Sequence, residues 1–173
     1  MSKLDNNFIK IPKITSKRLI LDHPIQSDFK KLEVFLKSER SKYIGGPYSS
    51  FTSWTDFMAN IGHWTLYGYG LWSVRIKKNN EFIGRVGIIK PLMFNEPDLA
   101  WQLFEKYEGK GYALEATKTI LNYILNNINI LRLASHILEN NKKSISLANK
   151  LGVKKVEKQI IDNKRFIVYF HKF

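Results

Sequence analysis

One stretch near the middle of the chain, DLAWQLFEKYEGKGYALEA from Asp98 to Ala116, decides the fold. Its first six residues alternate with a period of two, which is typical of a strand, and from Tyr112 onward the apolar spacing becomes helical. Gly109 and Gly111 stand at the change, where they allow a turn with positive φ and leave backbone N–H groups uncovered at the helix mouth. We therefore predict a strand, a glycine loop and a helix in that order.

A helix mouth of this kind attracts anions, because its unpaired amides and the positive end of the helix dipole point toward the ligand. Lys110 lies between the glycines, so a phosphate or pyrophosphate is the expected ligand, although such a turn also occurs as a simple tight connection. A P-loop is excluded because a single residue separates the glycines. A dinucleotide fingerprint is excluded because its third glycine would fall at Leu114.

Composition indicates one globular domain over residues 1–173, with 44% hydrophobic residues. The chain has no cysteine, which excludes disulfides, thiolate metal sites and a cysteine nucleophile, and suits a reducing compartment. The cytoplasm is the expected location, because the longest uncharged run is interrupted by polar residues and glycines and no signal peptide is apparent. The four histidines show no ligand spacing, so no metal site is expected.

The formal net charge of +13 raises the question of a nucleic-acid partner. Residues 142–173 hold nine Lys/Arg against two Asp/Glu, and the first forty hold nine against five. The excess is therefore terminal and diffuse, and lysine greatly outnumbers arginine, whereas nucleic-acid recognition favours arginine. A nucleic-acid partner ranks last among the alternatives, although the positive field would steer anionic ligands toward the protein.

The remaining pattern predicts strands and helices on both sides of the central stretch. Thr52 or Ser53 is a candidate N-cap of the second helix, and Ser27 and Asp28 offer N-cap chemistry for the first. Predicted strands lie at 18–22, 71–76, 81–90, 131–138, 153–160 and 165–170, and predicted helices follow Asp28, Ser53, Gly111 and Asn141. This order predicts an α/β (α+β) fold with a mixed, mainly antiparallel sheet of about seven strands flanked by about four helices, including one parallel pair across the glycine helix.

Several side chains near the central strand carry possible chemistry. The carboxylates that could accept a proton are Glu96, Asp98, Glu105 and Glu108. His136 stands alone in an apolar strand and is expected to be a packed residue. The aromatic block at residues 51–72 is expected to be mostly core, with one or two rings at a substrate cleft. The candidates for substrate contact are Trp54 and Trp64 of this block and Trp101 of the central strand.

Nearly the whole chain resembles the GCN5-related N-acetyltransferase (GNAT) superfamily, in particular its RimJ/RimL-like branch. Five segments carry the resemblance in order: TSKRLILDHPIQSDFKKL, GYGLWSV, EFIGRVGI, DLAWQLFEKYEGKGYALEA and LRLASHILENNKKSISLANKLGV. The resemblance implies the GNAT fold, acetyl-CoA as cofactor, transfer of its acetyl group to a primary amine, and a possible homodimer. The amine would belong to a protein N-terminus or a small molecule.

The resemblance also implies roles for individual residues. The backbone at Leu103 and Phe104 would bind the pantetheine arm and the thioester carbonyl, and Asn140 would hydrogen-bond the arm. Ser144 would lie near the sulfur. The pyrophosphate would be wrapped by the loop Glu108, Gly109, Lys110, Gly111, Tyr112 and Ala113.

Three departures from the family pattern bear on the chemistry. Lys106 stands where the family has Gln or Arg and could still serve a phosphate of the cofactor, and Val153 replaces a phenylalanine. Ala148 occupies the position of the tyrosine that protonates the leaving thiolate in many members, so Ser144 or water must substitute. Asp98 is the leading water-relayed base, and Glu96 is the second.

Two alternatives remain open at this stage. A GNAT-fold module could bind acyl-CoA without turnover, as Ala148 suggests, and a basic nucleic-acid-binding protein is the weaker alternative. The acceptor amine stays unassigned between peptide N-termini, lysine side chains, aminoglycosides, polyamines and amino sugars.

Overall fold

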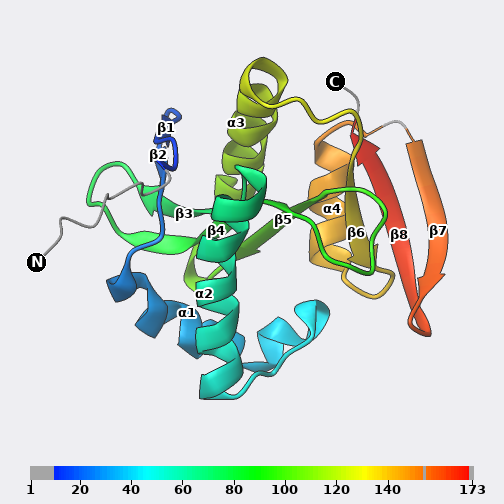
Figure 1. Ribbon diagram of the computed structural model, residues 1–173, viewed down its shortest axis with the longest axis horizontal. Coiled ribbons are helices and arrows are strands. Elements are labelled where there is room, and N and C mark those ends of the chain that lie inside the picture. Colours follow the sequence, from blue (N-terminus) through cyan, green and yellow to red (C-terminus); the bar gives the residue numbers. More distant parts are fainter. Residues whose placement is uncertain (1–9, 154, 172–173) are drawn as a thin grey trace, which may run out of the picture.

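The computed structural model describes residues 10–153 and 155–171, without the side chain of residue 155. Over these residues, eight strands form one sheet in the order β1-β2-β3-β4-β5-β6-β8-β7 (Figure 1). The strands are Ile14–Thr15 (β1), Leu19–Asp22 (β2), Leu71–Ile76 (β3), Phe82–Ile89 (β4), Asp98–Leu103 (β5), Leu133–Leu138 (β6), Lys155–Ile161 (β7) and Lys164–His171 (β8). The α-helices are Phe29–Leu36 (α1), Ser50–Tyr67 (α2), Tyr112–Asn127 (α3) and Lys142–Lys150 (α4), with a 3-10 segment η2 at Glu39–Ile44.

Neighbouring strands run antiparallel except β5 and β6, which are parallel and joined through α3. This confirms the predicted mixed sheet and its parallel pair. Strands β7 and β8 are joined by a two-residue turn, in which Asp162 and Asn163 both take positive φ, as a type I′ hairpin turn requires. In the described part of the chain, no helix combines the length and apolarity that a membrane crossing demands.

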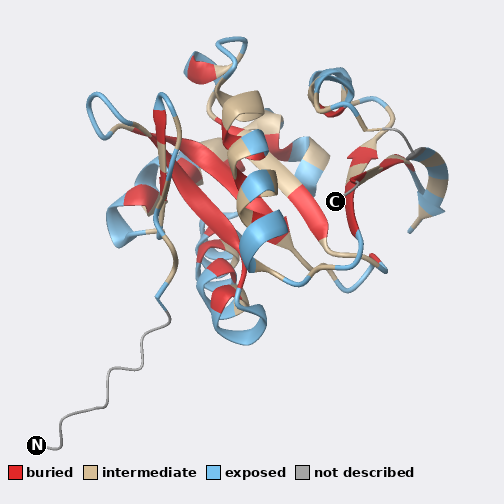
Figure 2. Ribbon diagram, turned by 90° about the horizontal axis from the view of Figure 1, so that it is seen from above, coloured by how far each residue is buried: buried red, intermediate tan, exposed pale blue. Residues whose placement is uncertain are grey.

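Alternation along β5 places α3 and α2 on opposite faces of the sheet. Leu103 packs with Ile120 of α3 in the main core. On the other face, Gln102 accepts a hydrogen bond from Arg85 of β4, and Arg85 lies 2.6 Å from Asp56 of α2. Figure 2 shows the buried strands between helices whose outer faces are exposed. Residues one apart on β5 therefore serve different layers.

The structure corrects the predicted N-cap of α2 and adds one short strand. Helix α2 begins at Ser50, and its N-cap is Ser49, whose hydroxyl accepts from Thr52 N at 3.0 Å. Thr52 and Ser53 are thus inside the helix. The short strand β1 was not predicted, because two residues are too few to show a period.

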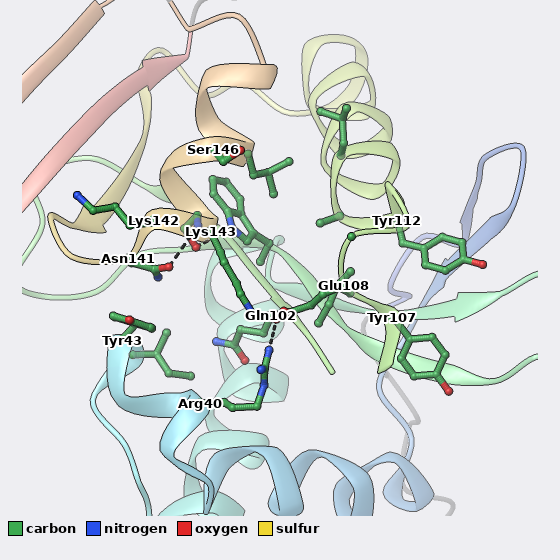
Figure 3. Close-up of a pocket in the computed structure, with 18 of the residues that line it drawn as sticks. Arg40, Tyr43, Gln102, Tyr107, Glu108, Tyr112, Asn141, Lys142, Lys143 and Ser146 are labelled. Carbon is green, nitrogen blue, oxygen red and sulfur yellow. Dashed lines mark hydrogen bonds and ion pairs between the residues drawn. The ribbon is translucent and has the colours of Figure 1, made fainter. Parts of the chain in front are cut away.

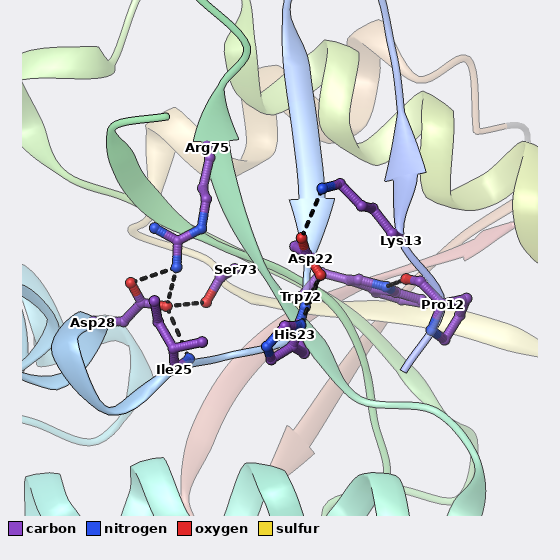
Figure 4. Close-up of polar contacts among 9 residues, drawn as sticks. All are labelled: Pro12, Lys13, Asp22, His23, Ile25, Asp28, Trp72, Ser73 and Arg75. Atoms are coloured by element: carbon purple, nitrogen blue, oxygen red, sulfur yellow. Dashed lines mark hydrogen bonds and ion pairs between the residues drawn. The ribbon is translucent and has the colours of Figure 1, made fainter. Parts of the chain in front are cut away.

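Asp28 precedes α1, but its side chain does not cap the helix (Figure 4). The carboxylate instead accepts from Arg75 Nη2 at 2.6 Å and from the Ser73 hydroxyl at 2.8 Å. Asp28 is 2% exposed and Arg75 is 7% exposed. This buried ion pair ties the start of α1 to β3 in the middle of the sheet.

His171, at the end of β8, is buried beside Ser135 of β6. The Ser135 hydroxyl donates to the Leu99 carbonyl at 2.7 Å, so it accepts from His171 Nε2, which lies 2.9 Å away. Burial lowers the pKa of His171 from 6.5 to about 4.

We expect the free energy of unfolding to fall as pH drops from about 6.5 to about 4, because His171 is protonated in the unfolded chain and still neutral in the folded protein over this range. The shift corresponds to at most roughly 3 kcal/mol. Urea unfolding across this range should show a smaller pH slope for His171→Gln, which keeps a donor but does not titrate. Equal slopes for the two proteins would contradict this assignment.

Candidate active site

The glycine loop ends at Gly111, where α3 begins. Gly109 and Gly111 take φ values of 71° and 78°, a left-handed conformation that side chains disfavour. The first helical bond runs from Glu115 N to Gly111 O at 3.0 Å. The amides of residues 112–114 therefore precede intrahelical bonding and remain available at the positive end of the helix.

A cavity of about 1090 Å³ opens beside this loop, bordered by η2, α3 and α4. Figure 3 shows Arg40 and Tyr43 of η2 on one wall and Lys142 and Lys143 of α4 on another. The basic residues that line the cavity are Arg40, Lys42, Lys142, Lys143 and Lys150. Cations and open amides around one cavity suit a ligand that carries several negative charges.

Glu108 lies between two of these cations (Figure 3). Its carboxylate contacts Arg40 on one side and accepts from Lys143 Nζ at 2.7 Å on the other. Arg40 also lies 3.2 Å from Glu105. An anionic ligand in this cavity would compete with Glu108 for both cations.

Strands β5 and β6 pair at a single point, where Asp98 lies opposite Ala134. Next to it, side chains take over the role of ladder bonds: the Ser135 hydroxyl donates to the Leu99 carbonyl, and His136 N donates to Asp98 Oδ1 at 2.7 Å. Residues 101–103 of β5 pair with β4 on one side, and on the other side they border the large cavity instead of β6. Main-chain groups on that edge are left for a ligand.

Asp98 and His136 form a buried pair. His136 Nδ1 lies 2.9 Å from Asp98 Oδ1, and Phe94 stacks on the imidazole with 3.8 Å between ring centroids. The side chain of Asp98 is 9% exposed, and that of His136 is 1% exposed. Burial raises the pKa of Asp98 above 3.8, and the hydrogen bonds from His136 oppose this rise. A carboxyl group in such a setting can take up and release a proton at a cavity wall.

Asp98 and His136 line a second cavity, of about 380 Å³, on the α2 side of the sheet. Tyr43, Ile44 and Gln102 line both cavities, so the two cavities meet at these residues. Groups bound in the two cavities would therefore have these three residues as common neighbours.

Arg18, just before β2, supports the glycine loop without lining the cavity. Its Nη1 donates to the Lys110 carbonyl at 3.0 Å, and its Nε donates to Glu115 at 2.6 Å. Its guanidinium also lies 4.5 Å from the centroid of the Tyr112 ring. In a trans peptide, C=O and N–H point in opposite directions, so the bond to Lys110 turns the Gly111 N–H away from Arg18.

The structure brings most of the predicted cofactor-binding residues to the large cavity. Those in its lining are Leu103, Glu108, Gly109, Gly111, Tyr112, Ala113, Asn140 and Ser144. Phe104 is outside this lining: its side chain packs against Phe82, and its backbone N donates to the Ile83 carbonyl at 2.9 Å. Lys106 Nζ lies 3.8 Å from Glu81, and Lys110 Nζ lies 5.9 Å from the centroid of the Tyr107 ring. The expectation that these two lysines face the bound anion is corrected, because both extend around Tyr107 and neither lines the cavity.

The predicted substrate tryptophans do not gather at the smaller cavity. Trp101 lines the larger one, where its Nε1 donates to the Ser144 hydroxyl at 3.2 Å. A substrate role for Trp64 is wrong, because Trp64 is 1% exposed and packs edge-on against Trp72 in the core. Trp54 packs against α1 and lines neither cavity.

Two further residues change the candidate list. Glu96, the second candidate base, lies 3.7 Å from Arg132 and lines neither cavity. Ala148 is fully buried beside Tyr169, so its position presents no proton donor. Sequence reasoning did not single out Tyr43 or Arg40, because both lie in η2, a short 3-10 segment without a periodic pattern.

Comparison with known proteins identifies the family of this site. The family model of the acetyltransferase (GNAT) domain matches residues 18–154. YkkB of Bacillus subtilis (strain 168), described as uncharacterized, is 33% identical over 89 residues, which cover 50% of this chain and 52% of YkkB. The chain thus spans about half the length of that relative.

Solved structures extend the likeness to the whole fold. An acetyltransferase from Agrobacterium tumefaciens str. C58 is similar with a TM-score of 0.85 and 28% identity, covering 98% of this chain and 100% of that one. RimL, a ribosomal L7/L12 alpha-N-protein acetyltransferase solved in complex with coenzyme A, has a TM-score of 0.74 at 16% identity. That match covers 92% of this chain and 97% of RimL, and it concerns the fold.

Proposed function

The chain belongs to the acetyltransferase (GNAT) family, and from this premise we propose that it transfers an acetyl group from acetyl-CoA to a primary amine. The observation that carries the proposal is the meeting of two cavities at Tyr43, Ile44 and Gln102. The larger is lined by cations and open amides, and the smaller contains the buried carboxyl group of Asp98. One cavity suits an anionic donor, and the other suits a basic acceptor.

The donor set of the larger cavity fits acetyl-CoA. The amides that follow Gly109 and Gly111 suit its pyrophosphate, and Lys142, Lys143 and Lys150 offer positive charge for its phosphates. The free edge of β5 at residues 101–103 offers main-chain partners for the amides of the pantetheine arm.

Acetyl-CoA supplies an acetyl thioester, and transfer forms a C–N bond, breaks the C–S bond, removes one proton from the amine and adds one to the sulfur. Asp98 accepts the amine proton directly or through water, while His136 holds the carboxylate in place. The hydroxyl of Tyr43 or Ser144, both in the cavity lining, would donate the proton to the sulfur of the bound thioester. A lysine amine, with a reference pKa of about 10.4, needs more help than a peptide N-terminus at about 7.7 to 8.0.

Gly109→Asp should abolish acetyl-CoA binding. The substitution places a carboxylate at the loop and strains a left-handed residue, so we expect at least roughly a 100-fold loss of affinity from like-charge repulsion. Calorimetric titration and the ligand-induced rise in melting temperature both measure the loss.

Gly68→Asp is the matched control, because Gly68 has a φ of 72° and open space at its Cβ position, yet lines neither cavity. It should bind acetyl-CoA as the wild type does. Equal binding by the two variants would reject the loop as the anion site, and no binding by the wild type would reject the proposed function.

Buried Ala148 favours a second candidate function, in which the same site binds acyl-CoA without turnover. A broad panel of amines, read by release of free thiol, separates the two candidates. Binding without thiol release from any amine would favour the module.

A further inference from the structure

Resting on the proposed function, we infer that the smaller cavity selects its acceptor: a compact monoamine whose amino group is attached to an apolar, preferably aromatic, body. The inference comes from the size of the cavity, its apolar walls and the pairing of its polar side chains. It separates this class from amino sugars, aminoglycosides, polyamines and extended peptides.

The size of the cavity sets the first limit. Its volume of about 380 Å³ lies at the low end of the range for small-molecule sites. It is bounded by α2, by residues 91–94 and by the sheet face of β4, β5, β6 and β8. A compact amine fits such a space, whereas an oligosaccharide needs a more extended groove.

The walls are mostly apolar. The residues that contribute apolar surface include Ile89, Met93, Phe94, Leu138, Ile161 and Phe166. Phe94 and Phe166 meet edge to face, with 5.7 Å between centroids, and present ring surface beside His136. Burying an apolar body against such walls favours binding in proportion to the area removed from water.

Two polar side chains of the wall are already paired within the protein. Asn60 donates to the Leu71 carbonyl at 2.9 Å and accepts from Leu71 N at 2.8 Å. His63 Nε2 accepts from Lys90 N at 2.9 Å, while Nδ1 lies 2.6 Å from the Tyr69 carbonyl. A ligand rich in hydroxyl groups would lose hydrogen bonds to water on entry, and these two paired side chains would not replace them.

Four charged side chains line this cavity: Asp56, Arg85, Asp98 and Lys164. Lys164 adds a positive charge, which disfavours an acceptor with several positive charges. Arg85 lies 2.6 Å from Asp56 and donates to Gln102. Its positive charge is therefore already neutralised by Asp56 and is not available to bind an anionic acceptor. The hydrogen bonds from His136 stabilise the negative charge of Asp98. Asp98 also lines the cavity, where its one carboxylate can pair with one ammonium group. A polyamine would bring further charges into apolar walls at a high desolvation cost.

The test compares 2-phenylethylamine with glucosamine, spermidine and a seryl tripeptide as acceptors, using the full chain and thiol release. We expect kcat/KM for 2-phenylethylamine to exceed each of the others by roughly tenfold or more, the gain expected from burying an aromatic ring. Higher kcat/KM for any of the other three, or no transfer to 2-phenylethylamine by protein that binds acetyl-CoA, overturns the inference. If the protein does not bind acetyl-CoA at all, the result rejects the proposed function and not this inference.

Two variants test whether the smaller cavity is the site that binds the amine. Ala59 is an exposed residue of α2 that lines the smaller cavity, so Ala59→Trp should fill the cavity and raise KM for 2-phenylethylamine about tenfold, with KM for acetyl-CoA unchanged. Met58→Trp adds the same ring at a neighbouring exposed position outside both cavities, and should leave both constants unchanged. If both variants changed KM for 2-phenylethylamine equally, the amine would bind outside the smaller cavity.

Discussion

Asp98→Asn is expected to lower kcat by about 10²- to 10⁴-fold, the usual contribution of a positioned general base. The amide oxygen can still accept from His136 N, so the fold and the affinity for acetyl-CoA should persist. Burial raises the pKa of Asp98, so wild-type activity should fall as pH drops through that raised value and protonates the base. The residual activity of the variant should lack this acidic limb. Rates of thiol release against pH measure both effects.

Glu96→Gln provides the comparison, because Glu96 also precedes the central strand but pairs with Arg132 outside both cavities. Its kcat should stay within about twofold of the wild type, since Glu96 lines neither cavity and its partner Arg132 has a side chain that is 67% exposed. A large loss in Glu96→Gln together with a small one in Asp98→Asn would transfer the role of base to Glu96.

Asp28→Ala should cost about 3 to 5 kcal/mol of unfolding free energy, because it leaves the buried guanidinium of Arg75 without its partner. The measurement is denaturant unfolding at neutral pH. In an Arg75→Met background the same substitution should cost much less, since no buried cation is then left unpaired.

Asp22→Ala is the matched control on the neighbouring strand (Figure 4). Asp22 lies 3.3 Å from Lys13, whose side chain is 59% exposed, so the loss should stay near 1 kcal/mol or less. Similar losses at Asp22 and Asp28 would mean that burial does not set the contribution of these ion pairs.

The glycine loop could be predicted from the sequence because its signal is local. Gly109 and Gly111 mark positive φ, and the change of period at Tyr112 marks the start of α3. The order of strands and helices then fixed one parallel crossover, which the structure confirms. The conformation of the glycines and the start of the helix depend mainly on residues that are adjacent in the sequence.

The second cavity could not be predicted, because its parts come from distant segments. His136 seemed a lone residue in an apolar strand, and only the register of β6 beside β5 brings it to Asp98. Asp28 is a residue type that often caps a helix, but its carboxylate instead pairs with the buried guanidinium of Arg75 on β3. Trp64 and Trp101 are alike in sequence terms, yet one fills the core and the other borders a cavity.

The contact between Arg18 and the Lys110 carbonyl joins the first strands of the chain to the glycine loop. If the loop is ordered further by a bound phosphate, the free energy of coupling acts in both directions. A ligand that fixes the loop also holds Arg18, and with it the junction of β1 and β2, in the docked position. Loosening that junction weakens binding of the ligand by the same factor, so the β1–β2 junction and ligand binding at the glycine loop are thermodynamically coupled.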